Sequence, residues 1–265
     1  MKKQRLLLLF MSLFCLVLMG CNHQQQRIGT KKSTLIVGLD DSYVPMGFVK
    51  KSGQLTGFDV DLAKLVGQKI HRKIVFQPID WSMKETELRN GTIDLIWNGY
   101  TKTPQRAQKV AFSQPYLKDS QVVVVKRSSN IHNMQQLKGK VVGTQAGSSG
   151  YSALMGHPQL LKNRIKNRTP VLYDNIENGF LDLKAGRIEG FLFDRVFADY
   201  YLAHSKDRKQ FVTLTTDFSG ESFAIGMRKN DSSTRQEINS ALNQLRQNGQ
   251  LKKLSQKWFQ HDISK

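Results

Sequence analysis

The stretch TIDLIWNGYTKTPQRA, residues 92–107, combines an apolar strand with a turn that carries hydroxyl groups and a guanidinium. Its first seven residues predict a strand, and Gly99 ends it. Thr101 and Arg106 then lie on the turn beyond the strand. Such side chains bind a carboxylate or a phosphate, or else they cap the next helix and face water. The stretch alone leaves both interpretations open.

Strands and helices alternate on both sides of this stretch, and this alternation predicts an α/β fold with parallel sheets. In such sheets, ligands bind beyond the carboxyl ends of the strands, which is where Arg106 stands. The chain is long enough for one large domain or for two lobes of roughly 100 residues. The predicted strands cover residues 34–40, 73–79, 92–98, 119–127, 140–145, 188–193 and 222–228, and the predicted helices cover 57–70, 81–91, 149–155, 176–186, 237–249 and 251–259.

The first residues have the pattern of a secretory signal peptide. Basic residues precede an uncharged apolar run, and the run ends in LMGC at Cys21. This ending resembles a bacterial lipoprotein box, in which the cysteine is lipidated after cleavage. An ordinary cleavable signal followed by a free cysteine is the alternative. We expect a lipoprotein signal peptide at residues 1–20, lipidation of Cys21, and a flexible polar tether over 21–33.

The chain is strongly basic, with a formal net charge of +19. Attraction to an anionic membrane or wall surface, nucleic-acid binding, or a bias toward solubility would each account for the charge. The basic residues are scattered, and no aromatic residues or nucleic-acid motif accompany them. We therefore expect an anionic surface outside the cell and no nucleic-acid partner.

Catalytic and metal-binding patterns are weak. The segment GSSGY, residues 147–151, fails the G-x-S-x-G nucleophile motif because Tyr151 stands where glycine is needed. No phosphate-binding loop of the G-x-x-x-x-G-K-[ST] type occurs, and no two histidines have metal-ligand helical spacing. The sequence predicts no catalytic residue, no cofactor and no metal.

Patterns typical of ligand binding are more frequent. GTQAGSSG, residues 143–150, joins a strand to a helix, so the backbone N–H groups near Ser148 and Ser149 form a second candidate anion site. A plain serine cap is the alternative. Tyr43 and Trp81 each follow a strand end, where an aromatic ring either fills the core or contacts the carbons of a ligand.

Two acidic residues also follow predicted strands. Asp40, in GLDDSY, and Asp194, in FLFDR, stand where a carboxylate caps the next turn or pairs with a bound cation. Nothing in the local pattern chooses between the two roles. Both stay candidates for a binding site.

Several motifs, taken in chain order, resemble those of the extracytoplasmic substrate-binding proteins of polar amino-acid ABC importers. They are GLDDSYVPMGF, GFDVDLAKLVG, ELRNGTIDLIWNGYTKTPQR, VVGTQAGSSGY, LDLKAGRIEGFLFD and LRQNGQLKKLSQKWF, and they cover the chain after the tether. The resemblance implies an α/β, two-lobed type II periplasmic-binding-protein fold with a mainly parallel, helix-flanked sheet in each lobe. Residues 34–120 and 218–265 would form lobe I and residues 121–217 lobe II, with the ligand in the cleft between them.

The resemblance also implies how the carboxylate of an amino acid is bound. Arg106 would take the α-carboxylate with its guanidinium fork, and Thr101 would add hydroxyl and amide donors. Ser148 and Ser149 would donate from the second lobe, at a helix start. Ser149 stands where many members of the family have threonine.

The rest of the ligand would meet a second group of residues. Asp194 and the carbonyl of Gly99 would bind the α-ammonium. Tyr43 and Trp81 would sandwich the carbons of the side chain, and Asp40 would receive a cationic side chain. We therefore lean toward a basic amino acid such as arginine, with glutamine, histidine and cystine as alternatives.

The implied function is capture of an amino acid outside the cell and its delivery to ABC permease subunits by ligand-driven lobe closure. The protein would act as a monomer, held to the outer face of the cell membrane by its lipid. An exported dehydratase-type enzyme on the same fold is the alternative from another class, because a fold does not fix a function.

Overall fold

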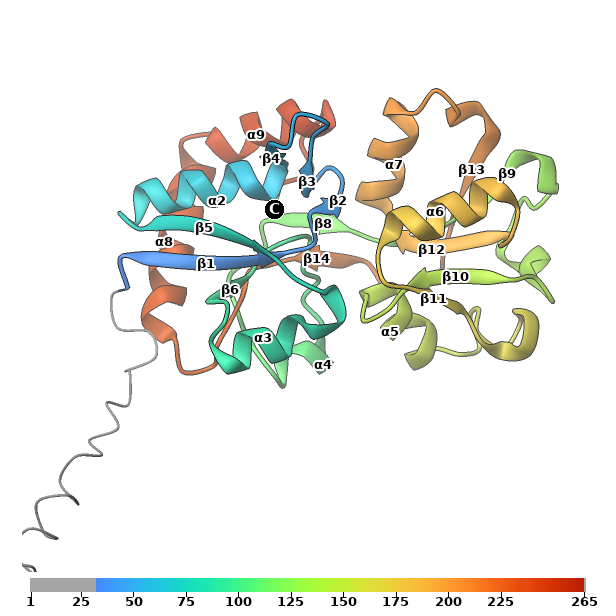
Figure 1. Ribbon diagram of the computed structural model, residues 1–265, viewed down its shortest axis with the longest axis horizontal. Helices are drawn as coiled ribbons and strands as arrows, with labels where there is room; N and C mark the ends of the chain where they lie inside the picture. Colours follow the sequence, from blue (N-terminus) through green and yellow to red (C-terminus); the bar gives the residue numbers. More distant parts are fainter. Residues whose placement is uncertain (1–31, 265) are drawn as a thin grey trace, which may run out of the picture.

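Two five-stranded sheets lie side by side along the long axis of the molecule, each within its own lobe (Figure 1). The computed structural model describes residues 32–264. The predicted signal peptide, Cys21 and most of the predicted tether therefore lie outside the described residues. Lys32, at the end of that tether, forms an ion pair with Asp94 of lobe I. Within 32–264, no helix has the length and apolar character needed to cross a membrane.

The first sheet has the strand order β5-β1-β6-β15-β7. β1 pairs in parallel with β5 and β6, and β15 pairs antiparallel with β6 and β7, so four strands run one way and β15 runs the other. The strands are β1 (Thr34–Leu39), β5 (Lys73–Pro78), β6 (Leu95–Ile96), β7 (Ala111–Phe112) and β15 (Gly226–Met227). Its helices are α2 (Phe58–Lys69), α3 (Lys84–Asn90), α4 (Pro104–Ala107), α8 (Ser232–Gln247) and α9 (Gln250–Phe259).

The second sheet repeats this plan with the order β11-β10-β12-β9-β13. β10 pairs in parallel with β11 and β12, and β9 runs antiparallel between β12 and β13. The strands are β9 (Gln121–Lys126), β10 (Val142–Gln145), β11 (Val171–Tyr173), β12 (Gly190–Asp194) and β13 (Phe211–Thr215). Its helices are α5 (Ser149–Gly156), α6 (Ile176–Ala185) and α7 (Arg195–His204). The expected mainly parallel, two-lobed α/β architecture is confirmed.

Two short strands join the lobes. β8 (Leu117–Asp119) leads into β9, β14 (Glu221–Phe223) leads back toward β15, and the two pair antiparallel with Asp119 opposite Glu221. The strand that follows each crossing, β9 or β15, is the one that runs against its sheet. The lobe limits expected near residues 120 and 218 lie beside these two strands and stay a prediction.

Local burial and backbone geometry explain which strands and helix ends could be predicted from the sequence. The four valines of β9 are fully buried, two in each of the cores on its opposite faces, so this strand is a continuous apolar run. The stop signals at Gly91 and Gly186 are confirmed, because both glycines end helices in the left-handed conformation, with φ of 83° and 78°.

Other elements differ from the expectation. The strand expected over 222–228 is two strands, β14 and β15, because the chain changes pairing partner where it re-enters lobe I. The strand expected over 92–98 is ordered as strand only in β6, and the helix expected over 81–91 begins with a 3₁₀ turn, η1 (Trp81–Met83). The small sheet of β2 (Ser42–Tyr43), β3 (Gly47–Val49) and β4 (Leu55–Thr56) was not expected, nor were α4 and α7.

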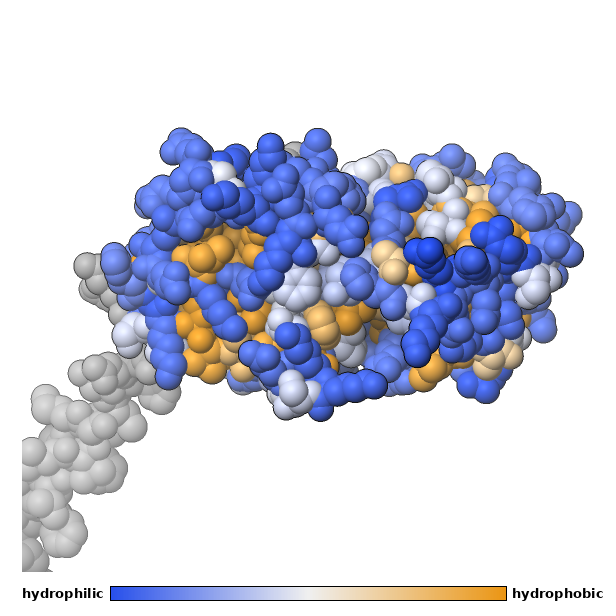
Figure 2. All heavy atoms as spheres, turned by 90° about the horizontal axis from the view of Figure 1, so that it is seen from above, coloured by the Kyte–Doolittle hydropathy of each residue, from blue (hydrophilic) through white to orange (hydrophobic). Residues whose placement is uncertain are grey.

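The charged residues lie mainly on the outside. On the face in Figure 2, hydrophilic residues cover most of the visible surface of both lobes, with smaller hydrophobic areas between them.

The large aromatic side chains that the sequence places near strand ends are buried, Tyr43 at 5% exposure and Trp81 at 6%. Both rings belong to buried hydrophobic clusters, Tyr43 to a large one and Trp81 to a smaller one in lobe I, so they fill the core as the sequence alternative allowed.

Candidate functional site

A small cavity of about 20 Å³ lies between the lobes, beyond the carboxyl ends of strands from both sheets. It is small because polar side chains from the two lobes contact each other directly across it. Of the predicted site residues, only Thr101 and Asp40 are missing from its wall, and each forms a hydrogen bond with a residue of the wall, Thr101 with Ser149 and Asp40 with Gln145. The lining residues are Tyr43, Trp81, Gly99, Arg106, Gln145, Ser148, Ser149, Ile176, Phe193 and Asp194.

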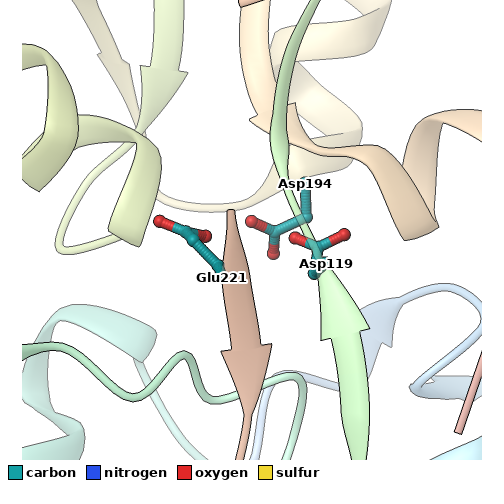
Figure 3. Close-up of side chains that lie close together, drawn as sticks. All are labelled: Asp119, Asp194 and Glu221. Carbon is teal, nitrogen blue, oxygen red and sulfur yellow. The ribbon is translucent and has the colours of Figure 1, made fainter. Parts of the chain in front are cut away.

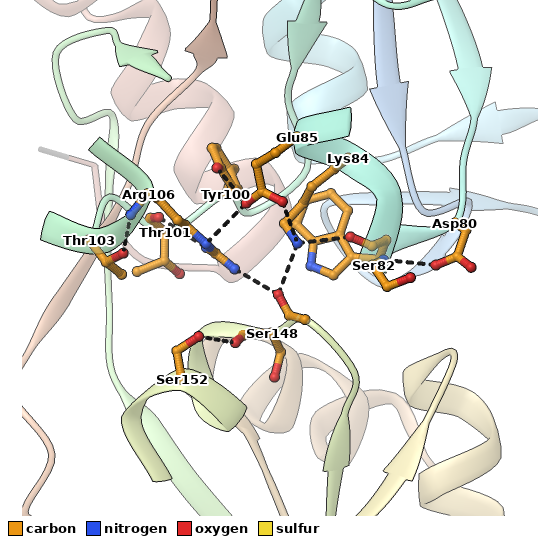
Figure 4. A network of polar contacts seen from close by, with 12 residues as sticks. Asp80, Ser82, Lys84, Glu85, Tyr100, Thr101, Thr103, Arg106, Ser148 and Ser152 are labelled. Carbon is orange, nitrogen blue, oxygen red and sulfur yellow. Dashed lines mark hydrogen bonds and ion pairs between the residues drawn. The ribbon is translucent and has the colours of Figure 1, made fainter. Parts of the chain in front are cut away.

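Arg106 provides the positive charge at one end of the cavity. The short helix α4 presents it, and the Thr103 hydroxyl caps that helix by accepting a hydrogen bond from the Arg106 N–H at 3.1 Å. The Arg106 side chain is only 8% exposed. It donates to the carbonyl of Thr101 at 3.0 Å and, across the lobes, to the carbonyl of Gly147 at 3.1 Å (Figure 4). A guanidinium held in this way can exchange a carbonyl for a carboxylate.

The start of α5 faces Arg106 from the second lobe. Ser148 is the N-cap, and its hydroxyl accepts a hydrogen bond from the Tyr151 N–H at 3.0 Å. The Thr101 hydroxyl donates to the Ser149 hydroxyl at 3.1 Å, which joins the two lobes. The positive end of a helix and a guanidinium therefore converge on one point, and this arrangement favours an anion. The serine-cap interpretation holds for Ser148 as well.

Asp194 provides the opposite charge. It stands at the N-cap of α7 but caps no backbone N–H group. Its carboxylate points between the lobes, where it accepts hydrogen bonds from the Tyr43 hydroxyl, from the Gln121 amide at 2.5 Å and from the Ser149 hydroxyl at 3.3 Å. The ring of Tyr43 also stacks on Phe197 of α7 at 5.7 Å.

Asp194 belongs to a cluster of three carboxyl groups at the crossing strands, with Asp119 and Glu221 (Figure 3). One oxygen of each lies within 4.8 Å of the others. Burial, followed by repulsion from Asp194, raises the pKa of Asp119 and raises that of Glu221 to about 7. No ion pair within residues 32–264 involves any of the three. The three acids therefore disfavour one another's ionised forms, and a bound cation would relieve that repulsion.

Asp40 lies behind the wall of the cavity. One carboxylate oxygen accepts hydrogen bonds from the backbone and hydroxyl of Ser42, at 2.9 and 2.6 Å. The other accepts one from the amide of Gln145 at 3.0 Å, across the lobes. Gln145 itself lines the cavity and was not singled out from the sequence. Asp40 is therefore a turn cap and an interlobe partner, with Gln145 between it and the cavity.

Asp59 is a further residue that the sequence did not reveal as part of the site. It lies in the first turn of α2 with 1% exposure, and it accepts hydrogen bonds from the Gly99 N–H at 2.7 Å and the Tyr116 hydroxyl at 2.9 Å. Burial raises the pKa of Asp59 to about 7. Gly99 has a φ of 56°, and a Cβ there would lie 2.6 Å from the ring of Tyr43. Asp59 thus fixes a backbone turn that only glycine fits. The sequence signal that could have revealed Asp59 is an acidic residue on the buried, apolar side of helix α2.

Residues 35–261 match the bacterial extracellular solute-binding proteins, family 3. The chain belongs to this family. It is 31% identical to the arginine-binding extracellular protein ArtP of Bacillus subtilis, over 97% of this chain and 98% of ArtP. It is 29% identical to the L-cystine-binding protein TcyJ of Escherichia coli, over 89% and 86%. A substrate-binding protein of an ABC uptake transporter from Streptococcus pneumoniae, with bound histidine, superimposes with a TM-score of 0.86 at 44% identity, over 88% and 94%.

These similarities confirm the family resemblance found in the sequence. They also agree with the two-lobed arrangement of the sheets, because the neighbouring structures are two-lobed binding proteins of the same kind. For this family 3 protein, the interlobe cavity and its two oppositely charged ends are the candidate binding site. The role of each lining residue is a proposal.

Proposed function

We propose that this family 3 protein captures a polar L-amino acid outside the cell, with a preference for basic side chains, and delivers it to the permease of an ABC importer. The observation that carries the proposal is the separation of charge in one interlobe cavity. Arg106 and the start of α5 mark one end, and Asp194 with its acidic neighbours marks the other. A zwitterion matches both ends. The arginine, cystine and histidine ligands named for the relatives support the ligand class.

The ligand would replace interlobe bonds that the protein makes to itself. Its carboxylate takes the guanidinium of Arg106 in place of the Gly147 carbonyl, with donors from Thr101 and the start of α5. Its ammonium takes the carboxylate of Asp194 in place of the Tyr43 hydroxyl, and the carbonyl of Gly99 lies on the same wall. Each exchange keeps a bridge between the lobes, so the ligand favours the closed state.

The side chain would extend toward Tyr43, Trp81 and Gln145. Aromatic faces suit a guanidinium or an imidazolium, and Asp40 supplies a negative charge behind Gln145. Arginine heads the expected order, and histidine follows because of the bound histidine in the pneumococcal neighbour. Capture without catalysis is part of the proposal, because the carboxylates of Asp40 and Asp194 already accept hydrogen bonds from neutral donors rather than being left free as a general acid or base.

A thermal-shift screen of L-arginine, L-histidine, L-lysine, L-glutamine and L-cystine tests the ligand class. A ligand at roughly 100 times its Kd stabilises a protein by about 2.7 kcal/mol, which a raised melting temperature reveals. We expect arginine or histidine to give the largest shift. Asp40→Asn should weaken these two more than glutamine, and Asp41→Asn serves as the matched control. A largest shift from glutamine or cystine, untouched by Asp40→Asn, would refute the preference for basic side chains.

We infer the cellular location of the protein from the first residues of its sequence. The LMGC ending and the glutamine-rich segment after it support lipidation of Cys21 and anchoring to the outer face of the cell membrane. The protein would work there as a monomer beside its permease. Cys21→Ala should release the protein from the membrane fraction. If that variant stays as firmly bound as the unchanged protein, the lipid is not the anchor.

A further inference from the structure

Lys84 is a buried lysine that the proposed ligand contacts leave unused. It begins α3 in lobe I, and its side chain is 2% exposed. Its ammonium donates to the carbonyl of Trp81 at 2.8 Å in its own lobe and to the carbonyl of Gly147 at 2.9 Å in the other. Glu85, the acid that pairs with it, lies 3.6 Å away. Both of these hydrogen bonds therefore go from Lys84 to backbone carbonyls, and one of the two carbonyls lies in the other lobe.

The carbonyl of Gly147 accepts two cationic donors at once. Arg106 donates to it at 3.1 Å, beside Lys84, and both side chains point toward the segment that carries Ser148 (Figure 4). In the proposed function, Arg106 turns to the ligand's carboxylate. The Gly147 carbonyl would then lose a partner at a buried position, which is costly unless a second donor is in place. Lys84 is that second donor.

We propose that Lys84 is a positioning residue that latches the Gly147 carbonyl to lobe I and so holds the start of α5 in the closed position without touching the ligand. The inference rests on the proposed function, because closure around a ligand is what gives the latch its use. Gly147 has a φ of 67°, and a Cβ there would lie 3.1 Å from the backbone of Ser82 and 3.3 Å from the Lys84 ammonium. The two lobes therefore meet closely at this point.

The protonation state of Lys84 makes the contact between Lys84 and Gly147 measurable as a pH dependence of binding. Burial, followed by the nearby charge of Arg106, lowers the pKa of Lys84 to about 7; Lys109 acts in the same direction, and Glu85 opposes them. Residues 146–149, which face it from the second lobe, carry no charge. When the lobes open, Lys84 gains water and its pKa moves toward the ordinary value of about 10.4. Closure should therefore release a proton from Lys84, and the contribution of Lys84 to affinity should rise with pH above about 7, opposite in sign to that of the interlobe carboxyls Asp119 and Glu221.

The test compares Lys84→Met with Lys109→Met in stopped-flow binding of L-arginine and L-histidine between pH 6.5 and 8.5. Methionine keeps an unbranched side chain that is one atom shorter and removes its donors, whereas Lys109 is an exposed cation near Lys84 that does not donate to Gly147. We expect Lys84→Met to speed dissociation of both ligands by about tenfold, to change association less than about twofold, and to abolish the rise of affinity with pH. Lys109→Met should keep that rise.

An unchanged dissociation rate in folded Lys84→Met overturns the proposal, and so does a loss confined to one of the two ligands. If Lys84→Met does not fold, Lys84→Gln replaces it. Glutamine keeps amide donors but cannot titrate, so this variant should lose the pH dependence of affinity while its dissociation speeds up less. An unchanged pH profile in Lys84→Gln overturns the proposal. If the unchanged protein binds neither amino acid, the proposed function fails by itself. The latch is then tested in ligand-free protein, where a radius of gyration no larger in Lys84→Met would refute it.

Discussion

The hydroxyl of Tyr43 donates a hydrogen bond to the carboxylate of Asp194, although the two residues are 151 positions apart and belong to different lobes. Burial, followed by the charge of Asp194, raises the pKa of Tyr43 well above its usual range, so the hydroxyl keeps its proton. Asp194 is therefore already bridged to lobe I by a donor of its own chain. An amino acid's ammonium would replace a neutral donor with a charged one, and this gain in electrostatic energy would contribute to ligand affinity.

Asp194→Asn should weaken amino-acid binding strongly. The amide cannot neutralise an ammonium, and the loss of a buried, hydrogen-bonded charge pair costs about 2–5 kcal/mol, or between one and four decades in Kd. Isothermal calorimetry with the best ligand of the thermal-shift screen measures it. Asp199→Asn, an exposed acid on the same helix α7, is the matched control. Equal affinities for the two variants would remove Asp194 from the ammonium site.

Arg106→Ala should weaken binding to a similar extent, by about 2–5 kcal/mol, because a bidentate contact to the ligand's carboxylate is lost. Arg106→Lys should recover only part of the affinity, since an ammonium lacks the planar fork. Arg89→Ala, an exposed arginine at the end of α3, controls for the change in net charge. An unchanged Kd in Arg106→Ala would show that the carboxylate binds elsewhere.

Local burial decided which parts of the fold the sequence could predict. The run VVVV of β9 and the stop glycines Gly91 and Gly186 depend on near neighbours and on backbone geometry, so they could be read directly. The split between β14 and β15 could not, because it depends on which distant strand each half meets. Helix α7 was missed although its cap residue, Asp194, was singled out, because that carboxylate serves the cleft and not the helix.

The same distinction holds for the candidate site. Tyr43, Trp81 and Arg106 follow strand ends, and strand ends of an α/β fold meet at one edge, so their position at the cavity was foreseeable. Lys84 and Gln145 were not, because their partners in the other lobe lie 63 and 105 positions away. Contacts across two lobes leave no periodic pattern in either one.

Asp59→Asn should change how the free energy of unfolding depends on pH. A carboxyl group whose pKa is about 7 when folded and about 3.9 when unfolded binds a proton more tightly in the folded state. Its contribution to stability is complete below about pH 4 and is lost as pH rises toward 7, by several kcal/mol in total. Asp59→Asn lacks this titration.

Urea unfolding of the unchanged protein and of Asp59→Asn at pH 5 and pH 8 measures the effect. We expect the variant to gain stability relative to the unchanged protein between the two pH values, because the asparagine oxygen still accepts from the Gly99 N–H. Asp217→Asn, an exposed acid, should show no such gain. A stability difference that is the same at both pH values would mean that Asp59 is ionised in the folded protein throughout this range.

Ligand binding should also make the molecule more compact, because the proposed contacts come from both lobes: Arg106 and Thr101 from the first, Ser149 and Asp194 from the second. β8 and β14 are the two paired segments that join the lobes, and closure by rotation about them would leave each five-stranded sheet unchanged. Small-angle scattering should give a smaller radius of gyration with saturating ligand than without it. Asp194→Asn at the same ligand concentration should stay close to the ligand-free value, because one bridge is missing. Identical scattering of the unchanged protein in the two states would refute closure as the response to the ligand, even if calorimetry shows tight binding.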